Sequence, residues 1–474
     1  MADLRSYLSL LEQDRELMTV DRKVQPGEEI ASVVKGLEPY GAPGVLFNSV
    51  EGTEWPVLMG TFGLRDRIAR ALGVPVRDCL DHVRRVQERP LPEPQAVEEA
   101  PVQQVVLRED EVDLAALPFA THSRDDAGKY ITSGVVVARD PETGNINTGM
   151  YRMMITGEKT LTVNAAPDHD LGRIFAAARE KGEQVPVAIV IGHHPAYLIA
   201  SQLKNPIAVD AHRVAGGLLG EGLRVSEGSS TPLPIPADAE LVLEGTVDPG
   251  RPVEEGPFGE FSYHYGQAKA PECTVTSISH RSQPIFQDLH PTHAEHLCLW
   301  LFPGREARLY EAVRRSVPGT LDARIPFHGG SFSAFVSVRK RKTGDGKQAI
   351  LAAFAADHFL KHVIVVDEDI DVHDTEEVLW ASHVRFQADE DMVIFGRAKG
   401  IRMDPSASQF STPLGTDTLT AKVGIDATRP LTGFPERADL PHPGFEDIDV
   451  SEYLSEESRA TVAQARALRP WFQE

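Results

Sequence analysis

The sequence has few cysteines, and their spacing excludes two common kinds of stabilisation. Cys79, Cys273 and Cys298 are far apart and form no CxxC pair. A disulfide framework and the usual zinc-ligand spacings are therefore excluded. This cysteine usage is typical of a reducing compartment.

Positive charge and long apolar runs are also scarce. Lys and Arg number 48 against 70 Asp and Glu, a formal net charge of −22, which argues against nucleic acid or an anionic membrane as a partner. Apolar runs such as Val185–Ile191 are far short of the ~20 residues that span a bilayer. The N-terminal residues carry no apolar core of a secretory signal. We expect a soluble, cytoplasmic protein with no membrane partner.

Several catalytic signatures are missing. The sequence contains no Walker A segment, no G-x-S-x-G elbow and no H-E-x-x-H helix, so P-loop, α/β-hydrolase and zincin chemistry lack support. The glycines around Gly216 depart from the dinucleotide-binding order, and we expect that segment to be flexible. Adjacent side chains diverge on most backbones, so the His193-His194 pair is interpreted as structural or superficial.

The length of 474 residues indicates roughly three domains. A small α/β domain comes first, and a segment rich in proline and acids at 89–101 is typical of a linker. Strands with turn chemistry between them then predict an antiparallel meander, and later alternation predicts βαβ units. The predicted helices are 1–20, 28–37, 65–72, 171–182, 306–316, 349–360 and 452–468. The predicted cap of the helix at 171–182 is Asp168 or Asp170. The predicted strands are 45–48, 56–59, 131–137, 146–155, 160–164, 185–191, 241–245, 273–278, 333–338 and 362–367.

Two glutamates flank a short Gly-Pro-Phe-Gly segment, from Glu255 to Glu260. On a regular strand the two side chains would point to opposite faces, and Pro257 with two glycines disfavours a helix. The pattern predicts a tight loop, which can turn both acids toward one cleft. Taken alone, the segment is also compatible with two solvated acids beside a surface turn.

Arg152 ends a mostly apolar strand that begins near Asn147. A buried arginine needs an anionic partner, which is either a structural carboxylate or the carboxylate of a substrate. Thr148-Gly149 indicates a bulge or the close approach of a ligand. His169 lies just before an amphipathic helix, where backbone N–H groups favour anions. A lone histidine in such a place is more often structural than a ligand.

Taken together, Asn147-x-x-x-x-Arg152, Glu255-Gly-Pro-Phe-Gly-Glu260 and the blocks around them resemble the UbiD family of reversible (de)carboxylases, which use prenylated FMN. The resemblance extends from Pro56 to Thr428. It implies an α/β (α+β) fold of three domains: an N-terminal α/β domain at 1–108, a central split β-barrel that binds the flavin at 109–305, and a C-terminal α/β oligomerisation domain at 306–474.

The resemblance also implies the chemistry. Arg152, Glu255 and Glu260 match the catalytic trio of the family: Arg152 would hold the substrate carboxylate and pair with Glu255, and Glu260 would deliver the proton that replaces CO₂. Loss of CO₂ would proceed through a covalent prenylated-FMN adduct, because no side chain is an electron sink. Burial and the neighbouring Glu255 are expected to raise the pKa of Glu260.

Cofactor contacts follow from the same resemblance. Asn147 and His169 match two ligands of a divalent metal, commonly Mn²⁺, with K⁺ nearby. Ala211 stands where the family usually has a third, acidic ligand; Asp210 and Glu221 are near but out of register. The remaining cofactor-binding positions are Met150, Arg152, Ser201 and Lys422.

His290, His293 and His296 lie where the family lines its substrate pocket. They favour a polar or heteroaromatic ring, so pyrrole-2-, indole-3- or furan-carboxylate is the predicted type of substrate, although one or two of them are equally explained by bonds to backbone groups. Tyr263 replaces a common glycine and is expected to narrow the pocket.

Two other functions are compatible with parts of the pattern. A conventional FMN oxidoreductase would explain the meander but not the two glutamates, and a non-catalytic subunit of a carboxylase complex would explain Ala211 but not the intact trio. The expected partners are a flavin prenyltransferase, which supplies the cofactor, and further copies of the chain in a homodimer or homohexamer.

Overall fold

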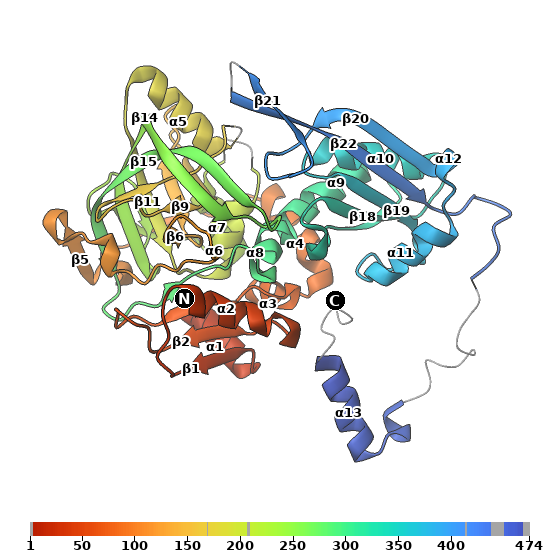
Figure 1. The fold of residues 1–474 in the computed structure, drawn as a ribbon, viewed down its shortest axis with the longest axis horizontal. Coiled ribbons are helices and arrows are strands. Elements are labelled where there is room, and N and C mark those ends of the chain that lie inside the picture. Colours follow the sequence, from red (N-terminus) through yellow and green to blue (C-terminus); the bar gives the residue numbers. More distant parts are fainter. Residues whose placement is uncertain (1–2, 168, 206–208, 413–414, 438–449, 468–474) are drawn as a thin grey trace. The chain divides into compact units, whose positions relative to one another are not determined.

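The computed structural model describes residues 3–167, 169–205, 209–412, 415–437 and 450–467. The chain divides into two compact units, Met1–Glu38 with Ala42–Ala307 and Pro39–Gly41 with Arg308–Glu474. Each unit mixes helices with sheets (Figure 1). Within the described residues no helix combines the length and apolar character needed to cross a bilayer.

The first unit begins with a four-stranded sheet in the order β1-β2-β3-β16. The stretch 1–20 is predicted as one helix, but its described residues contain a helix that ends at Gln13 and a strand that begins at Leu17. Four further predictions are confirmed to within about two residues: the helices at 28–37 and 65–72 and the strands at 45–48 and 56–59. The elements are α1 (Leu4–Gln13), β1 (Leu17–Val20), α2 (Glu28–Leu37), β2 (Gly44–Phe47), β3 (Val57–Met59), α3 (Arg65–Ala71), α4 (Cys79–Glu88) and β16 (Phe286–Gln287).

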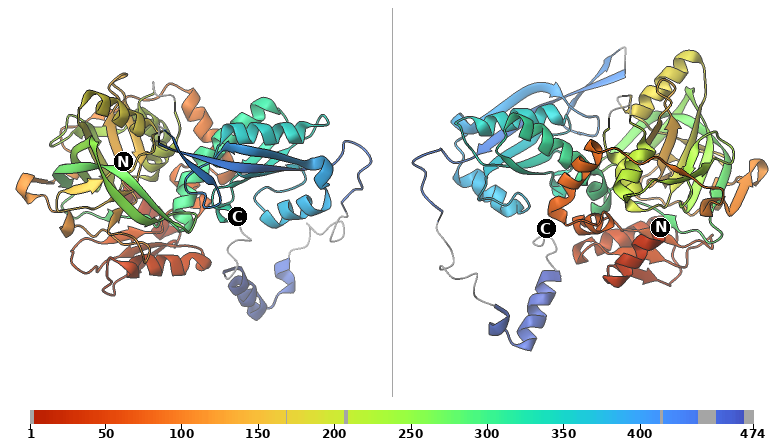
Figure 2. Two further views of the ribbon diagram at one scale, coloured as in Figure 1. Left: turned by 45° about the horizontal axis from the view of Figure 1, so that its top comes forward. Right: turned by 180° about the vertical axis from the view of Figure 1, so that it is seen from behind.

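The centre of this unit is a curled sheet, ordered β10-β15-β14-β11-β7-β8, with β5 on the outer side of β15 (Figures 1 and 2). All its pairs are antiparallel. Of the strands predicted as a three-stranded meander, β7 and β8 pair directly. The last step is reduced to an isolated antiparallel bridge between Ile155 and Leu161, and β10 pairs along its length with β15, far along the chain. The strands are β5 (Val105–Arg108), β7 (Val135–Arg139), β8 (Ile146–Met150), β10 (Thr160–Thr162), β11 (Val185–Ile191), β14 (Leu241–Gly259) and β15 (Tyr265–His280).

Strand β11 is an interior strand of this sheet, between β14 and β7. Six of its seven residues are buried, as expected for a strand covered on both faces. Helix α5 (Asp170–Lys181) packs against β11 and β14. Its N-cap is His169, which makes no side-chain cap bond, so Asp170 is not the cap; Asp168 lies outside the described residues.

Short elements complete the first unit. The segment around Gly216, predicted to be flexible, is helix α7, which Asp210 caps by accepting from the backbone N–H groups of His212 and Arg213. His194 caps α6, and His193 and His194 are both buried, so the pair is structural and not superficial. These elements are β4 (Gln95–Ala96), β6 (Tyr130–Ile131), β9 (Met153–Met154), α6 (Pro195–Gln202), α7 (Ala211–Leu219), β12 (Arg224–Glu227), β13 (Pro234–Pro236) and α8 (Ala294–Trp300).

The second unit is an α/β structure. Its sheet has the order β17-β18-β19-β22-β20, with β21 on β22. Strand β18 is parallel to β19, and β19 to β22, which confirms the predicted βαβ connections. The elements are α9 (Glu306–Ser316), β17 (Thr320–Arg324), β18 (Ser333–Val338), α10 (Asp345–Ala356), β19 (His362–Asp367), α11 (Thr375–Val384), α12 (Ala388–Asp391), β20 (Met392–Lys399), β21 (Ser408–Thr412), β22 (Gly415–Ala427) and α13 (Glu456–Ala467).

Candidate active site

The two glutamates lie at the end of β14, where the strand pairs irregularly with β15. The pairing shifts register between Glu255 and Phe258, and Gly256 has φ +101°. A Cβ at Gly256 would lie 2.6 Å from the backbone oxygen of Gly266, so only glycine fits there. The predicted tight loop is wrong for Glu255 to Gly259, which form a bulged strand. The bulge interrupts the alternation of side chains, and both glutamates reach the same arginine.

Arg152, between β8 and β9, joins the two glutamates. Its Nε and Nη2 donate to Oε1 and Oε2 of Glu255 at 3.0 and 2.7 Å. Its Nη1 donates to Oε1 of Glu260. A planar guanidinium suits such two-pronged pairing. The structure thus brings the three predicted catalytic residues together.

Arg152 and Glu255 lie in a largely buried, hydrogen-bonded environment. Glu255 is 1% exposed, and the side-chain amide of Asn164 donates to its Oε2 at 2.7 Å. The guanidinium carbon of Arg152 lies 4.9 Å from the ring centre of Phe258. Burial lowers the pKa of Arg152, but the carboxylates of Glu260 and Glu255 outweigh burial and raise that pKa above its ordinary value. Asn164 was not predicted, because nothing in its sequence spacing links it to Glu255.

A second segment, residues 122–130, supports the bulge from outside. The carboxylate of Asp126 accepts from the backbone N–H of Gly259 at 2.7 Å, and the N–H of Ala127 donates to the oxygen of Pro257 at 2.7 Å. The Tyr130 ring lies 4.5 Å from the ring of Phe258. Burial, and then the charge of Glu255, raise the pKa of Tyr130. The backbone between the two glutamates is therefore held on both sides.

Glu260 begins a tight turn and is less enclosed than Glu255. Its side chain is 13% exposed, and a Cβ on Gly266 would lie 2.6 Å from its Oε1. Tyr263, in this turn, has φ +58°, the region in which glycine is favoured. Tyr263 is 70% exposed, and the ammonium of Lys35 lies 5.6 Å from the centre of its ring. Its hydroxyl donates to the backbone oxygen of Thr292 at 3.4 Å, beside the predicted pocket histidines, and the narrowing of the pocket stays a prediction.

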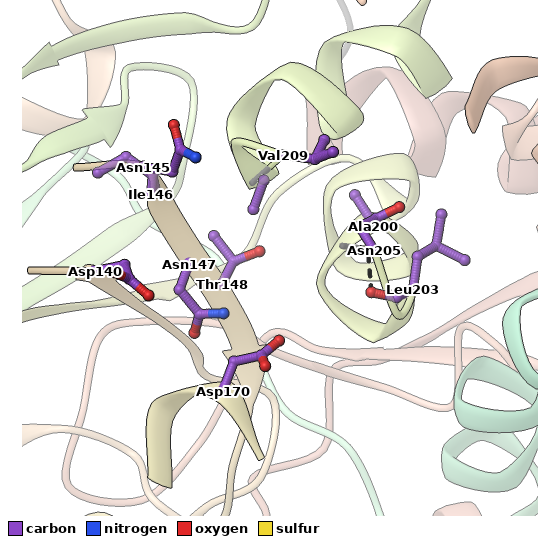
Figure 3. A pocket seen from close by; sticks show the side chains of 11 residues that line it. Asp140, Asn145, Ile146, Asn147, Thr148, Asp170, Ala200, Leu203, Asn205 and Val209 are labelled. Carbon is purple, nitrogen blue, oxygen red and sulfur yellow. Dashed lines mark hydrogen bonds between the residues drawn. The ribbon is translucent and has the colours of Figure 1, made fainter. Parts of the chain in front are cut away.

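A small polar pocket of about 40 Å³ lies beside β8 (Figure 3). Asn147, Asp170 and Ala211 are among the residues that line it. The Oδ1 atom of Asn147 is buried and accepts no hydrogen bond from the residues that the structure describes. A buried carbonyl of this kind requires a donor or a cation, so Asn147 fits its predicted role as a metal ligand. Among the described residues, no three His, Cys, Asp or Glu side chains gather as a metal cluster.

The remaining predicted cofactor residues have individual positions. The ring of His169 lies 5.9 Å from that of Tyr151, next to Arg152. Met150 ends β8, opposite Val135. The buried hydroxyl of Ser201 donates to the backbone oxygen of Leu198. Asp170, the residue after His169, is a pocket-lining acid that sequence spacing did not identify.

Lys422 belongs to the second unit. Its ammonium donates to the backbone oxygens of His358 and Leu360 at 2.8 and 2.6 Å. Burial lowers the pKa of Lys422 to about 8. Its contact with the cofactor stays a prediction.

The three predicted pocket histidines are buried or half-buried, and each commits one ring nitrogen to a backbone group. Nδ1 of His290 accepts from the N–H of Thr292, and Nδ1 of His293 accepts from that of Glu295. Nδ1 of His296 lies 3.0 Å from the oxygen of Pro291. Burial lowers the pKa of His293 and of His296 to about 4, and that of His290 well below its ordinary value. All three are therefore neutral at pH 7.

His122 extends this histidine group and was not predicted from the sequence. Its Nε2 lies 2.9 Å from the carboxylate of Asp288, and its ring centre is 6.1 Å from that of His290. His122 and His290 are far apart in the sequence and come close only in the folded chain, so no motif spacing could predict their contact.

Family models match nearly the whole chain. They describe 3-octaprenyl-4-hydroxybenzoate carboxy-lyase: its N-terminal domain at residues 8–86, its Rift-related domain at 95–294 and its C-terminal domain at 300–427. The fold and these matches define the protein as a carboxy-lyase. The chain belongs to the UbiD family.

Similar proteins agree with this assignment. The anhydromevalonate phosphate decarboxylase of Aeropyrum pernix is 35% identical over 91% of this chain and 93% of its own. The UbiD-class enzyme HmfF from Pelotomaculum thermopropionicum, solved in complex with FMN, is 37% identical with a TM-score of 0.89, over 95% of this chain and all of its own. The 3,4-dihydroxybenzoic acid decarboxylase AroY of Klebsiella pneumoniae is 28% identical with a TM-score of 0.84, over 96% of this chain and all of its own. The expected α/β (α+β) fold is confirmed.

Proposed function

We propose that this protein catalyses the reversible, non-oxidative decarboxylation of a small aromatic or heteroaromatic acid, with prenylated FMN as its cofactor. Arg152, Glu255 and Glu260 are the proposed catalytic residues. The observation that carries the proposal is the position of Arg152, which donates to both glutamates from one guanidinium.

Arg152 binds the carboxylate of the substrate in this proposal. Glu255, fully buried and bonded through both oxygens, keeps the arginine in place. Glu260 holds it by one oxygen and is partly exposed. An incoming carboxylate therefore displaces Glu260 from Arg152 more easily than Glu255.

This displacement prepares Glu260 to act as an acid. A carboxyl group that loses a cationic partner becomes easier to protonate. When bound, prenylated FMN supplies the electron sink for the pair left on the substrate carbon. The bond between that carbon and CO₂ breaks, and Glu260 delivers a proton to the carbon; solvent then returns a proton to Glu260.

The substrate is proposed to be a pyrrole-2-, indole-3- or furan-carboxylate type of acid. Neutral, largely buried imidazoles at His290, His293 and His296 support a polar ring over a long apolar chain. His293 retains an Nε2 that is buried and without a partner among the described residues, which suits a hydrogen bond to a substrate heteroatom.

A second candidate substrate is an unsaturated acid that carries a phosphate. The names of relatives in Aeropyrum pernix and Methanothermobacter thermautotrophicus, 35% and 34% identical, favour it. A phosphate would require a cation, and Lys35, which bonds to the backbone oxygen of Thr292 at 2.8 Å, lies next to the histidine segment. Lys35 is already paired with Glu38, which weakens this candidate.

The proposal includes protein partners and metal ions. A flavin prenyltransferase supplies the prenylated FMN, and Mn²⁺ and K⁺ bind near the phosphate of that cofactor. A homodimer or homohexamer is supported by apolar side chains on β20 and β21, where Ile394 is 67% and Phe410 44% exposed. Light scattering of the purified protein measures the number of copies.

The test is co-expression with a flavin prenyltransferase, followed by an absorption spectrum and a CO₂-release assay. The substrate panel contains the three heteroaromatic acids, 3,4-dihydroxybenzoate and anhydromevalonate phosphate. Release from the heteroaromatic acids supports the proposal, and release only from anhydromevalonate phosphate selects the second candidate. An ordinary flavin spectrum with NAD(P)H oxidation would indicate an oxidoreductase, and an inert, correctly loaded protein would indicate a non-catalytic subunit.

A further inference from the structure

The pocket beside β8 has no acidic side chain at position 211, where the UbiD family usually has a metal ligand, but it has one at position 170. Ala211 lines the pocket with a methyl group, which cannot bind a cation. The neighbouring Asp210 does not replace it, because its carboxylate accepts from the backbone N–H groups of Ile146 at 2.8 Å and His212 at 2.9 Å. Asp210 instead links α7 to β8 through these hydrogen bonds. Neither Ala211 nor Asp210 therefore offers the pocket a carboxylate that is available to a cation.

Asp170 brings a carboxylate to the same pocket from the start of α5 (Figure 3). The Asp170 carboxylate forms an ion pair with Arg173, one helical turn later. The Arg173 side chain is 54% exposed. An exposed ion pair is weak and opens readily in water. The other pocket acid, Asp140, already accepts from the backbone N–H groups of Glu142 and Thr143. Asp170 is therefore the carboxylate most easily directed to a cation.

We infer that Asp170, with the Oδ1 atom of Asn147, forms a divalent-cation site that a flavin phosphate completes. The inference rests on the proposed cofactor and adds a ligand to its site. Amide and carboxylate oxygens are hard donors of the kind that Mn²⁺ and Mg²⁺ prefer. Mg²⁺ and similar ions commonly bind through one or two carboxylates together with phosphate oxygens.

Asn147, Asp170 and the predicted ligand His169 leave much of the coordination sphere to other groups, so the cation and the flavin phosphate bind cooperatively. Cooperative binding is reciprocal: the phosphate strengthens cation binding by the same factor as the cation strengthens flavin binding. Riboflavin has the same ring system without the phosphate, and it provides the matched ligand. Adding a carboxylate at position 211 is expected to make the site less dependent on the flavin.

The test is a titration of the full-length protein with Mn²⁺, followed by electron paramagnetic resonance of free Mn²⁺, with FMN or with riboflavin present. Mn²⁺ is expected to bind roughly tenfold or more tightly with FMN than with riboflavin. Asp170→Asn is expected to remove most of this difference, and Ala211→Glu to allow tight binding with either flavin. Asp81→Asn is the matched control, because Asp81 also pairs with an arginine three residues later, Arg84, and its side chain is 43% exposed.

The outcomes separate this inference from the proposed function. Flavin fluorescence reports FMN binding independently, and failure to bind FMN would count against the proposed cofactor. If FMN binds but Asp170→Asn retains the affinity of the unaltered protein for Mn²⁺, the inference is wrong. Equal Mn²⁺ affinity with FMN and riboflavin would also overturn it.

Discussion

Arg152 holds Glu255 by two nitrogens and Glu260 by one, and this inequality separates the roles of the two glutamates. Glu255 is buried and also accepts from Asn164, whereas Glu260 begins a turn and is partly open to solvent. Glu255 is therefore the fixed partner of Arg152, and Glu260 is the partner that can be exchanged. Such an arrangement allows Arg152 to bind a substrate carboxylate while Glu260 is released to act as a proton donor.

Glu260→Gln tests the proton donor. The amide keeps the size of the side chain but has no acidic proton to deliver, so we expect CO₂ release and product H/D exchange to fall by at least about a hundredfold. Glu254→Gln is the control, because Glu254 is the residue before Glu255 and its side chain is 79% exposed. A Glu260→Gln variant that still exchanges deuterium at the normal rate would contradict the assignment.

Glu255→Gln tests the fixed partner. It leaves Arg152 with a buried positive charge that is less well compensated, so we expect a loss of roughly 3 kcal/mol in the free energy of unfolding, measured by urea denaturation. Substrate binding is expected to weaken as well, because the guanidinium loses its orientation. The same Glu254→Gln control is expected to unfold like the unaltered protein; equal stability of Glu255→Gln and that control would show that the pairing is not stabilising.

Glu295 predicts a pH dependence of stability. It is fully buried, and burial raises its pKa from 4.5 to about 8. The folded state therefore binds the proton between pH 4.5 and 8 while the unfolded state releases it, so this group makes stability fall as pH rises through that range. A shift of this size corresponds to several kcal/mol, on the order of 5.

Glu295→Gln removes that titration, because the amide resembles the protonated acid. We expect the variant and the unaltered protein to unfold at similar urea concentrations at pH 5, and the variant to be the more stable at pH 8. Both carry the same histidines, so the difference between them isolates Glu295. A constant difference at the two pH values would contradict the prediction.

Local patterns in the sequence were sufficient for much of the fold. Strands β11, β18 and β19 and helices α2 and α9 occur where the periodicity of apolar residues predicts them. The predictions failed where tertiary contacts decide the structure. Glu255 to Gly259 continue a strand because β15 supplies hydrogen bonds to them, and no local signal in Gly-Pro-Phe-Gly reports a partner strand.

The candidate site shows the same division. Arg152, Glu255 and Glu260 were identified through their motif spacing, which is local. Asn164 and Asp126, which support them, come from other segments and carry no pattern of their own. Contacts of that kind depend on the path of the chain, so a single sequence without the fold does not reveal them.

The exchange of partners at Arg152 makes a final prediction about protons. If a substrate carboxylate takes the place of Glu260 on Arg152, Glu260 exchanges a cation for a neighbouring anion in a partly buried site. Both changes favour its protonated form, so binding near neutral pH is expected to take up protons, up to one per site. Calorimetry of pyrrole-2-carboxylate binding in two buffers of different ionisation enthalpy measures this number. Glu260→Gln is expected to bind the acid without proton uptake, and Glu254→Gln to behave like the unaltered protein. Binding with no proton uptake in the unaltered protein would mean that Glu260 keeps its bond to Arg152, and another group would then have to supply the proton.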